Sequence, residues 1–356
     1  MTITLQKSKE TKHPTGDDAL FKDATKNILT DFNPSAPDDI RTLLSMQVRL
    51  FLNKSISAVS VTGFISETFD VALDRIIKDA ICTLGEPPCR FMFMLMGSEG
   101  RQEQTLRTDQ DSAIVFEDGP HQKYFLSLGK RVSDALNSLG VLYCQGNVMA
   151  SNPKWVMSVQ NWKKAFSRWV EEPEPMAVMQ ACIFFDLRYG YGDKEFETIL
   201  KQHINKLLTG RSGLFFYHMA QNALKHVIPL GFLGGLKKSA KKSLDIKKAL
   251  LPITDHARIY SLRHGIETQN TLKRIEKLHD AKLFKGANAE DVIYMYEFLT
   301  AVRLRNQLDQ MEQNIEPSNV INPSLLHEAT RRDLVSCMKN SKALQQNISL
   351  NFRAGY

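Results

Sequence analysis

A run of six apolar residues, followed at once by a glycine and a serine, constrains the fold of this chain most strongly. Residues 91–96 read Phe-Met-Phe-Met-Leu-Met, and such a run is typical of a strand buried on both faces. Gly97-Ser98 ends the run. A second strand is expected to begin near Asp109-Gln110-Asp111 and to continue through residues 113–116. The pattern predicts two strands in the core of a small sheet.

The two acids at the start of the second strand predict a metal site. Side chains alternate along a strand, so Asp109 and Asp111 should project from one face, about 6.6 Å apart along the chain. Two such carboxylates repel each other unless a cation lies between them. Mg²⁺, or Mn²⁺ in its place, suits them because it takes oxygen ligands and accompanies phosphates. Gly97-Ser98 lets backbone amides approach an anion, so together these residues indicate nucleotidyl transfer.

These residues resemble a known signature. Gly97-Ser98, ten residues and then Asp-x-Asp are similar to the polymerase-beta-like nucleotidyltransferases. The fuller string, with Gly100-Arg101-x-Glu-x-Thr and Thr108 before the first aspartate, resembles one branch more narrowly. That branch holds the N-terminal domain of protein-PII uridylyltransferases and the nucleotidyltransferases fused to CBS or cyclic-nucleotide-binding domains. The resemblance implies that Gly97, Ser98, Gly100, Arg101 and Thr108 contact the nucleotide.

A polar loop follows at residues 146–155, Gly-Asn-Val-Met-Ala-Ser-Asn-Pro-Lys-Trp, and the same family carries a similar segment there. Asn147 and Asn152 could contact a phosphate or a sugar of the nucleotide. The alternative is that both side chains satisfy turns, since Asn-Pro is a turn former. Both interpretations stay open.

A third acid is expected from the segment Ile-Phe-Phe-Asp-Leu-Arg at residues 183–188. The resemblance implies that Asp186 shares the metal with Asp109 and Asp111 and acts as the base for the attacking hydroxyl. The competing interpretation is that Asp186 pairs with Arg188 or another cation in the wall of the domain.

A lysine-rich patch lies in the second half of the chain. A triphosphate, a leaving pyrophosphate or an acidic protein partner could use such a patch, whereas a solvated loop is the alternative. Within it, Leu-Asp-Ile-Lys-Lys at 244–248 resembles a family segment, so Lys247 is the candidate nucleotide contact. The patch consists of Lys237, Lys238, Lys241, Lys242, Lys247 and Lys248.

The remaining periodicity is mostly helical. The sequence predicts an α+β protein: a small mixed-sheet nucleotidyltransferase domain with N-terminal helices, followed by an all-α helical-bundle domain. Residues 1–37 are expected to be a mobile tail, within which residues 18–32 could form one short helix with Asp18 as its N-cap. Residues 38–192 are expected to be the catalytic domain with its leading helices, and residues 193–356 the helical domain. The last resembles the substrate-binding domain of the CBS-fused branch. Its predicted helices span about 195–208, 214–228, 254–265, 271–283, 289–313 and 323–350.

Composition indicates the class of protein and the cellular compartment. An apolar share of 43% and a charged share of 24% are ordinary for a soluble protein, and no apolar run is long enough to cross a membrane. Five cysteines without a C-x-x-C pair argue against a disulfide framework and favour a reducing cytosol. The chain is expected to be cytoplasmic. A net charge of +7 suits a nucleotide, a nucleic acid or an acidic partner.

The sequence thus predicts a Mg²⁺-dependent enzyme that moves a nucleoside monophosphate from a triphosphate to a hydroxyl of a protein or small-molecule acceptor. Its activity would be uridylyltransferase- or adenylyltransferase-like, in a signalling context. The sequence shows no HD, ACT or CBS segment, so PII as the acceptor is not implied. Gln110 also departs from the broad superfamily, which prefers an apolar residue there. Two rivals remain, a catalytically silent nucleotide-binding regulator and a nucleic-acid-binding module driven by the lysine patch, and the acid pair argues against both.

Overall fold

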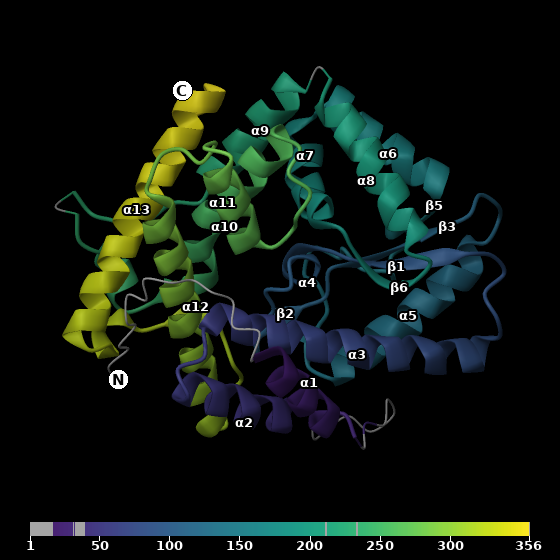
Figure 1. Ribbon diagram of the computed structural model, residues 1–356, viewed down its shortest axis with the longest axis horizontal. Coiled ribbons are helices and arrows are strands. Elements are labelled where there is room, and N and C mark those ends of the chain that lie inside the picture. Colours follow the sequence, from purple (N-terminus) through teal and green to yellow (C-terminus); the bar gives the residue numbers. More distant parts are fainter. Residues whose placement is uncertain (1–16, 31, 33–39, 211, 233, 356) are drawn as a thin grey trace. The chain divides into compact units, whose positions relative to one another are not determined.

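The chain forms two compact units (Figure 1). The computed structural model describes residues 17–30, 32, 40–210, 212–232 and 234–355. The N-terminal unit comprises Ser60–Phe215 and the described residues up to Ile56, and the C-terminal unit comprises Ser57–Val59 and the described residues from Phe216 onward.

A four-stranded mixed sheet forms the centre of the N-terminal unit, with the order β5-β3-β1-β6. β1 (Phe91–Leu95) runs antiparallel to both β3 (Ser112–Phe116) and β6 (Arg188–Gly192), while β5 (Val156–Ser158) runs parallel to β3. Every residue of β1 and β3 is buried. The uninterrupted apolar runs of the sequence therefore became the two central strands, as expected for strands covered on both faces.

Helices cover both faces of this sheet (Figure 1). α5 (Gln122–Ser138) packs against β3 and β5, whereas α6 (Val159–Glu171) and α8 (Glu195–Leu208) pack against each other and against β3 and β1, respectively. Trp162 of α6 is fully buried, and its indole nitrogen donates to the carbonyl of Ile114 at 3.0 Å. One α6 side chain thus fastens the helix to the sheet through both apolar area and a hydrogen bond.

Three helices precede the sheet: α1 (Asp17–Ile28), α2 (Ile40–Asn53) and α3 (Ala58–Leu84). The ring of Phe21 on α1 lies 5.0 Å from that of Phe51 and 5.4 Å from that of Phe64. Residues 17–28 therefore do not belong to the predicted mobile tail, because an apolar side of α1 is buried. Residues 1–16, 31 and 33–37 of that predicted tail lie outside the described residues.

The predicted boundary at residue 193 also differs from the division seen here, since the N-terminal unit continues to Phe215. The physical reason is α8, whose buried side places Phe196, Leu200 and Ile204 against the rest of that unit. Two short elements lead to β6: α7 (Pro175–Ala181) and the 3₁₀ helix η2 (Cys182–Asp186).

The expected second strand is split. Thr108–Asp109 forms β2, which pairs in parallel with β4 (Val141–Leu142), and β3 begins only at Ser112. Between them, the Gln110 amide donates to the carbonyl of Leu142 at 2.8 Å, while the Met96 amide donates to the carbonyl of Asp111 at 2.9 Å. The chain thus bends at Gln110-Asp111 as it passes from one small sheet to the other.

The C-terminal unit is a helical bundle built around α10 (Ile246–Arg263), which contacts α11 (Thr271–Asp280), α12 (Ala289–Glu312) and α13 (Glu328–Phe352). α9 (Gly213–Leu224) leads into it, and β7 (Leu244–Asp245) pairs antiparallel with β8 (Val320–Ile321). Three one-turn 3₁₀ helices complete the described chain: η1 (Pro153–Trp155) in the N-terminal unit, and η3 (Ser239–Lys241) and η4 (Pro323–Leu325) in the C-terminal unit.

The predicted α+β class is confirmed. The second half is all-α as predicted, apart from the short strands β7 and β8.

α10 begins eight residues before its predicted start at residue 254. The Asp245 side chain accepts from the amide of Lys248 at 3.2 Å and so caps the helix. Pro252 lies inside the helix and is buried. A proline in a helix interior removes a hydrogen bond, and packing of α10 on three neighbouring helices offsets that cost.

Candidate active site

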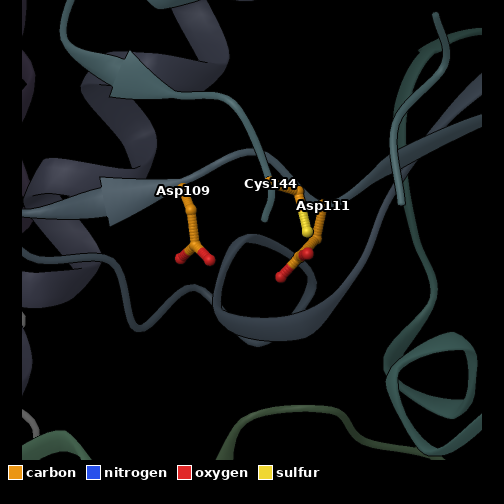
Figure 2. Close-up of side chains that lie close together, drawn as sticks. All are labelled: Asp109, Asp111 and Cys144. Atoms are coloured by element: carbon orange, nitrogen blue, oxygen red, sulfur yellow. The ribbon is translucent and has the colours of Figure 1, made fainter. Parts of the chain in front are cut away.

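The bend at Gln110-Asp111 brings the predicted acid pair together. Figure 2 shows the Asp109 carboxylate at the end of β2 and the Asp111 carboxylate beyond the bend, both directed into the same space. One ligand oxygen of each, together with the sulfur of Cys144, lie within 4.8 Å of one another. Asp111 is 6% exposed, so its negative charge is largely withdrawn from water. This is the juxtaposition that the alternation of side chains predicted, although a split strand produces it.

Cys144 is the member of this group that the sequence did not indicate. It follows β4, whose parallel pairing with β2 carries the thiol to the acids. Burial, and next the charge of Asp111, raise the pKa of Cys144 to about 11. The thiol is therefore protonated at neutral pH. Only knowledge of the β2–β4 pairing, which joins residues more than thirty positions apart, could have revealed it.

Gly97 begins the four-residue helix α4 (Gly97–Gly100) directly after β1. Its φ is +55°, and a Cβ there would lie 2.2 Å from Oδ2 of Asp111. No side chain other than hydrogen fits, because both the backbone conformation and the space exclude it. Ser98 comes next and is half-buried. The turn therefore lies directly against one of the two acids.

Gly100 and Thr108, which were predicted to contact the nucleotide, are both packed within the protein. A Cβ on Gly100 would lie 2.1 Å from the carbonyl oxygen of Asp186, so this glycine permits close backbone packing. Thr108 is 4% exposed, and its hydroxyl has no hydrogen-bond partner among the described residues. Their contacts to a nucleotide remain predictions.

Glu99 is a second residue that the sequence analysis missed. Its carboxylate accepts from the Asp111 amide at 3.1 Å and from the side-chain nitrogen of Gln104 at 3.1 Å. Burial raises the pKa of Glu99 well above its ordinary value. The Glu99 carbonyl in turn accepts from Arg188 at 3.0 Å. The Glu99 side chain thus holds the backbone of Asp111 in place.

Arg101 and Asp186 bind each other. Nη1 of Arg101 lies 2.7 Å from Oδ2 of Asp186, and Nε of Arg101 lies 2.7 Å from Oε2 of Glu103. Asp186 is fully buried and lies outside the group formed by Asp109, Asp111 and Cys144. Arg188, the partner considered from the sequence, instead forms a pair with Asp70 at 2.8 Å. The metal and base roles of Asp186 therefore stay predictions.

Gln110, which departs from the superfamily pattern, is fully buried. Its side-chain nitrogen donates to the carbonyls of Ser133 and Val141, each at 2.9 Å. A polar residue is accommodated at this inward position because two backbone acceptors surround it.

The two asparagines order their own loop. The carbonyl of Asn147, whose φ is +53°, accepts from the Asn152 side chain at 2.9 Å and from the Trp155 indole at 3.0 Å. Oδ1 of Asn152 accepts from the Lys154 amide at 3.0 Å and caps η1. The turn role is thus visible, while the nucleotide contact remains a prediction.

Lys247 belongs to the C-terminal unit, whereas the acid pair belongs to the N-terminal unit. It lies in the first turn of α10, beside the cap residue Asp245, and is half-buried. Its predicted nucleotide contact remains a prediction.

The donor set fits a divalent cation. Two carboxylates at close range, one largely buried, need a positive charge between them. Their oxygens are the ligands that Mg²⁺ and Mn²⁺ take, whereas the Cys144 sulfur is a soft donor that Mg²⁺ does not use. Asp109 and Asp111 would therefore hold the ion, and Gly97 lets the turn lie directly against Asp111.

Comparisons with known proteins identify the family of both halves of the chain. Residues 43–176 match the family described as "Putative nucleotidyltransferase DUF294", and residues 213–352 match the "Putative nucleotidyltransferase substrate binding domain". No curated protein matches the chain. Within the described residues, no helix combines the length and the apolar character needed to cross a bilayer. The two matched segments cover most of the chain, which therefore belongs to the DUF294 nucleotidyltransferase family and carries its C-terminal substrate-binding domain.

Proposed function

We propose that this protein transfers a nucleoside monophosphate from a nucleoside triphosphate to a hydroxyl of an acceptor, in a reaction that depends on Mg²⁺ or Mn²⁺. The observation that carries the proposal is the convergence of Asp109 and Asp111 beside Gly97, where a Cβ would collide with Asp111. An acid pair next to a small-residue turn is the arrangement that binds a metal-bound triphosphate.

Each part of the site has a role in this proposal. Asp109 and Asp111 hold the cation, which would neutralise charge on the phosphates. The backbone amides of Gly97 and Ser98 and the Ser98 hydroxyl contact the phosphates, since the first amides of a helix have no partner within it. Glu99 positions Asp111 through its backbone amide. The acceptor oxygen forms a bond to the α-phosphorus as its proton passes to water or to Asp186, the bond to the β-phosphate oxygen breaks, and pyrophosphate leaves.

Asp186 and Arg101 can be assigned in two ways. In the resemblance-based role, Asp186 takes the proton of the attacking hydroxyl and Arg101 contacts the phosphates. In the structure, the Arg101 guanidinium and the Asp186 carboxylate form an ion pair with each other, with Nη1 and Oδ2 2.7 Å apart. We favour a positioning role, in which the pair fixes the end of α4 next to the acid pair.

A catalytically silent nucleotide-binding protein is the second candidate, and the Arg101–Asp186 pair favours it, because it leaves two of three expected carboxylates in the metal group. The two candidates differ in pyrophosphate release. A silent protein binds the nucleotide without releasing pyrophosphate, whereas an enzyme releases it in step with labelling of an acceptor.

The test uses each of the four nucleoside triphosphates, labelled at the α-phosphate, with Mg²⁺ or Mn²⁺ and a cell extract as the source of acceptors. Wild type is compared with Asp109→Asn/Asp111→Asn and with Asp23→Asn/Asp79→Asn, which makes the same change at two exposed positions. We expect the acid-pair variant to lose about 100-fold or more of the transfer, and the control to keep it. Binding without pyrophosphate release in wild type would support the silent protein instead.

A further inference from the structure

A pocket of about 640 Å³ lies within the C-terminal unit, on residues to which the proposed transfer assigns no role. Its size falls in the range of about 300–1,000 Å³ that is usual for small-molecule sites. One wall is a face of α13, and the others come from the segment around η3 and from η4. The residues that define it are Leu236, Lys241, Arg331, Arg332, Val335 and Lys339.

The spacing along α13 explains why these side chains gather. Arg331, Val335 and Lys339 follow one another at intervals of four, so they form one stripe on the helix, and Arg332 begins the next stripe. Lys241 comes from η3, which packs against η4. It belongs to the lysine-rich patch of the sequence. Part of that patch is thus the rim of a pocket and not only a solvated loop.

The pocket is strongly positive. Four of its side chains are cationic, and none of the described residues that line it is acidic. Arg332 lies 3.9 Å from Glu328, but both side chains are mostly exposed, and such a surface pair holds its partners weakly. All four of these cationic residues are exposed, so water screens the repulsion between them, and an anion that they contact together relieves what remains.

The interior is apolar. Leu236 is 7% exposed and Val335 is half-buried. A mostly apolar wall with a few convergent polar groups is typical of a small-molecule site. Planar guanidinium groups match the oxygens of a phosphate in pairs, and a phosphate offers three acceptor oxygens where a carboxylate offers two.

We propose that this pocket binds a phosphorylated small molecule with an apolar or planar part, as the acceptor substrate of the chain. The role as acceptor rests on the proposed transfer, whereas the binding of the phosphorylated ligand does not. The family description of residues 213–352 as a substrate-binding domain supports a substrate site in this unit, and the pocket gives it a location.

The test measures binding of naphthyl phosphate to the full chain by calorimetry, with inorganic phosphate, naphthol and naphthoate as comparison ligands. Wild type is compared with Arg331→Gln/Lys339→Gln, which removes two cations from the pocket. The matched control is Lys273→Gln/Lys277→Gln, which removes two exposed lysines of α11. We expect naphthyl phosphate to bind more tightly than the other three ligands, and the pocket variant to lose at least about tenfold in affinity while the control does not.

Three results would overturn the proposal: wild type that does not bind naphthyl phosphate, a pocket variant that binds it as tightly as wild type, or naphthoate that binds equally well. The same titration of Asp109→Asn/Asp111→Asn should match wild type. If that binding stands while no transfer of nucleotide is found, the acceptor role falls together with the proposed function, and the phosphate site remains.

Discussion

Gly97 is the residue on which the geometry of the acid pair depends most directly. Its positive φ and the 2.2 Å approach of a Cβ to Asp111 allow only glycine. The close approach has a chemical consequence, because it brings the backbone of the turn next to the carboxylates, where its amides could contact a phosphate on the bound cation. At this scale, a single missing methyl group lets the turn and the acid pair meet.

The substitution Gly97→Ala should therefore lower affinity for a Mg²⁺–nucleotide by about tenfold or more and destabilise the fold by about 1–3 kcal/mol, because it adds strain and displaces Asp111. Gly63→Ala is the control: Gly63 lies within α3, and a Cβ there meets nothing within 4 Å. It should be neutral or stabilising by up to about 1 kcal/mol. Urea unfolding and nucleotide titration measure both. Unchanged nucleotide affinity in Gly97→Ala would contradict the assigned role.

Glu99 makes stability depend on pH. Burial raises the pKa of Glu99 well above its ordinary value of 4.5. The folded state therefore favours the neutral form of this side chain. The stability it contributes is present below pH 4.5 and is lost as pH rises through the folded pKa. Glu99→Gln cannot ionise. We expect the difference in unfolding free energy between variant and wild type to move in favour of the variant as pH rises from about 4 toward neutrality.

Urea titrations at several pH values measure this difference. Glu172→Gln, at an exposed position that follows α6, is the matched control and should give a difference that stays constant within about 0.5 kcal/mol. A constant difference for Glu99→Gln as well would show that Glu99 ionises normally.

At the scale of elements, the Arg101–Asp186 pair joins the end of α4 to η2. The two residues are 85 positions apart in the sequence, and the carboxylate is fully buried. Because Gly100 also touches the Asp186 carbonyl closely, these two elements meet through backbone and side chain together. The contact sets where α4, and with it Gly97, can lie.

Substitution of Arg101 should show how far the position of α4 depends on the Arg101–Asp186 pair. Arg101→Gln removes a charged partner of the buried Asp186 carboxylate and should cost about 3–5 kcal/mol, whereas Arg101→Gln/Asp186→Asn should recover most of that loss. Transfer activity of the double variant separates the roles. Activity near that of wild type supports a positioning pair. Activity that stays lost while stability returns supports a direct role for the pair, with Asp186 as the base or Arg101 as a phosphate contact.

On the scale of the whole molecule, the two units can be followed separately. The chain has three tryptophans, and Trp155, Trp162 and Trp169 all belong to the N-terminal unit. Their rings pack around Phe184, with centroids 4.6–5.4 Å away. Tryptophan fluorescence therefore reports on unfolding of the unit that contains the acid pair, while circular dichroism reports on both.

A Mg²⁺–nucleotide should shift the fluorescence-detected unfolding transition to higher denaturant, because a ligand at 100 times its Kd adds about 2.7 kcal/mol of stability. Asp109→Asn/Asp111→Asn should abolish the shift, and Arg331→Gln/Lys339→Gln should preserve it. A shift that survives in the acid-pair variant would place the nucleotide elsewhere.

Short-range pattern was enough to predict much of this molecule. The apolar run of residues 91–96 became β1, the alternation around Gln110 predicted that Asp109 and Asp111 would converge, and helical periodicity predicted the all-α second half. These features can be predicted from neighbouring residues, because strand alternation and helical spacing involve only a few positions.

The sequence by itself determined the class of fold and the Asp-x-Asp spacing of the two acids, since both are encoded locally. The pairing of β1 with β3 then placed the Gly97 turn beside them. Tertiary structure alone decided the partners: Arg101 and not Arg188 binds Asp186, Cys144 comes to the acids through the pairing of β2 with β4, and Glu99 supports Asp111. It also assembled a basic pocket from Lys241 and α13. Such contacts join residues far apart in the chain, so they depend on which surfaces pack together. Local periodicity does not predict which surfaces those are.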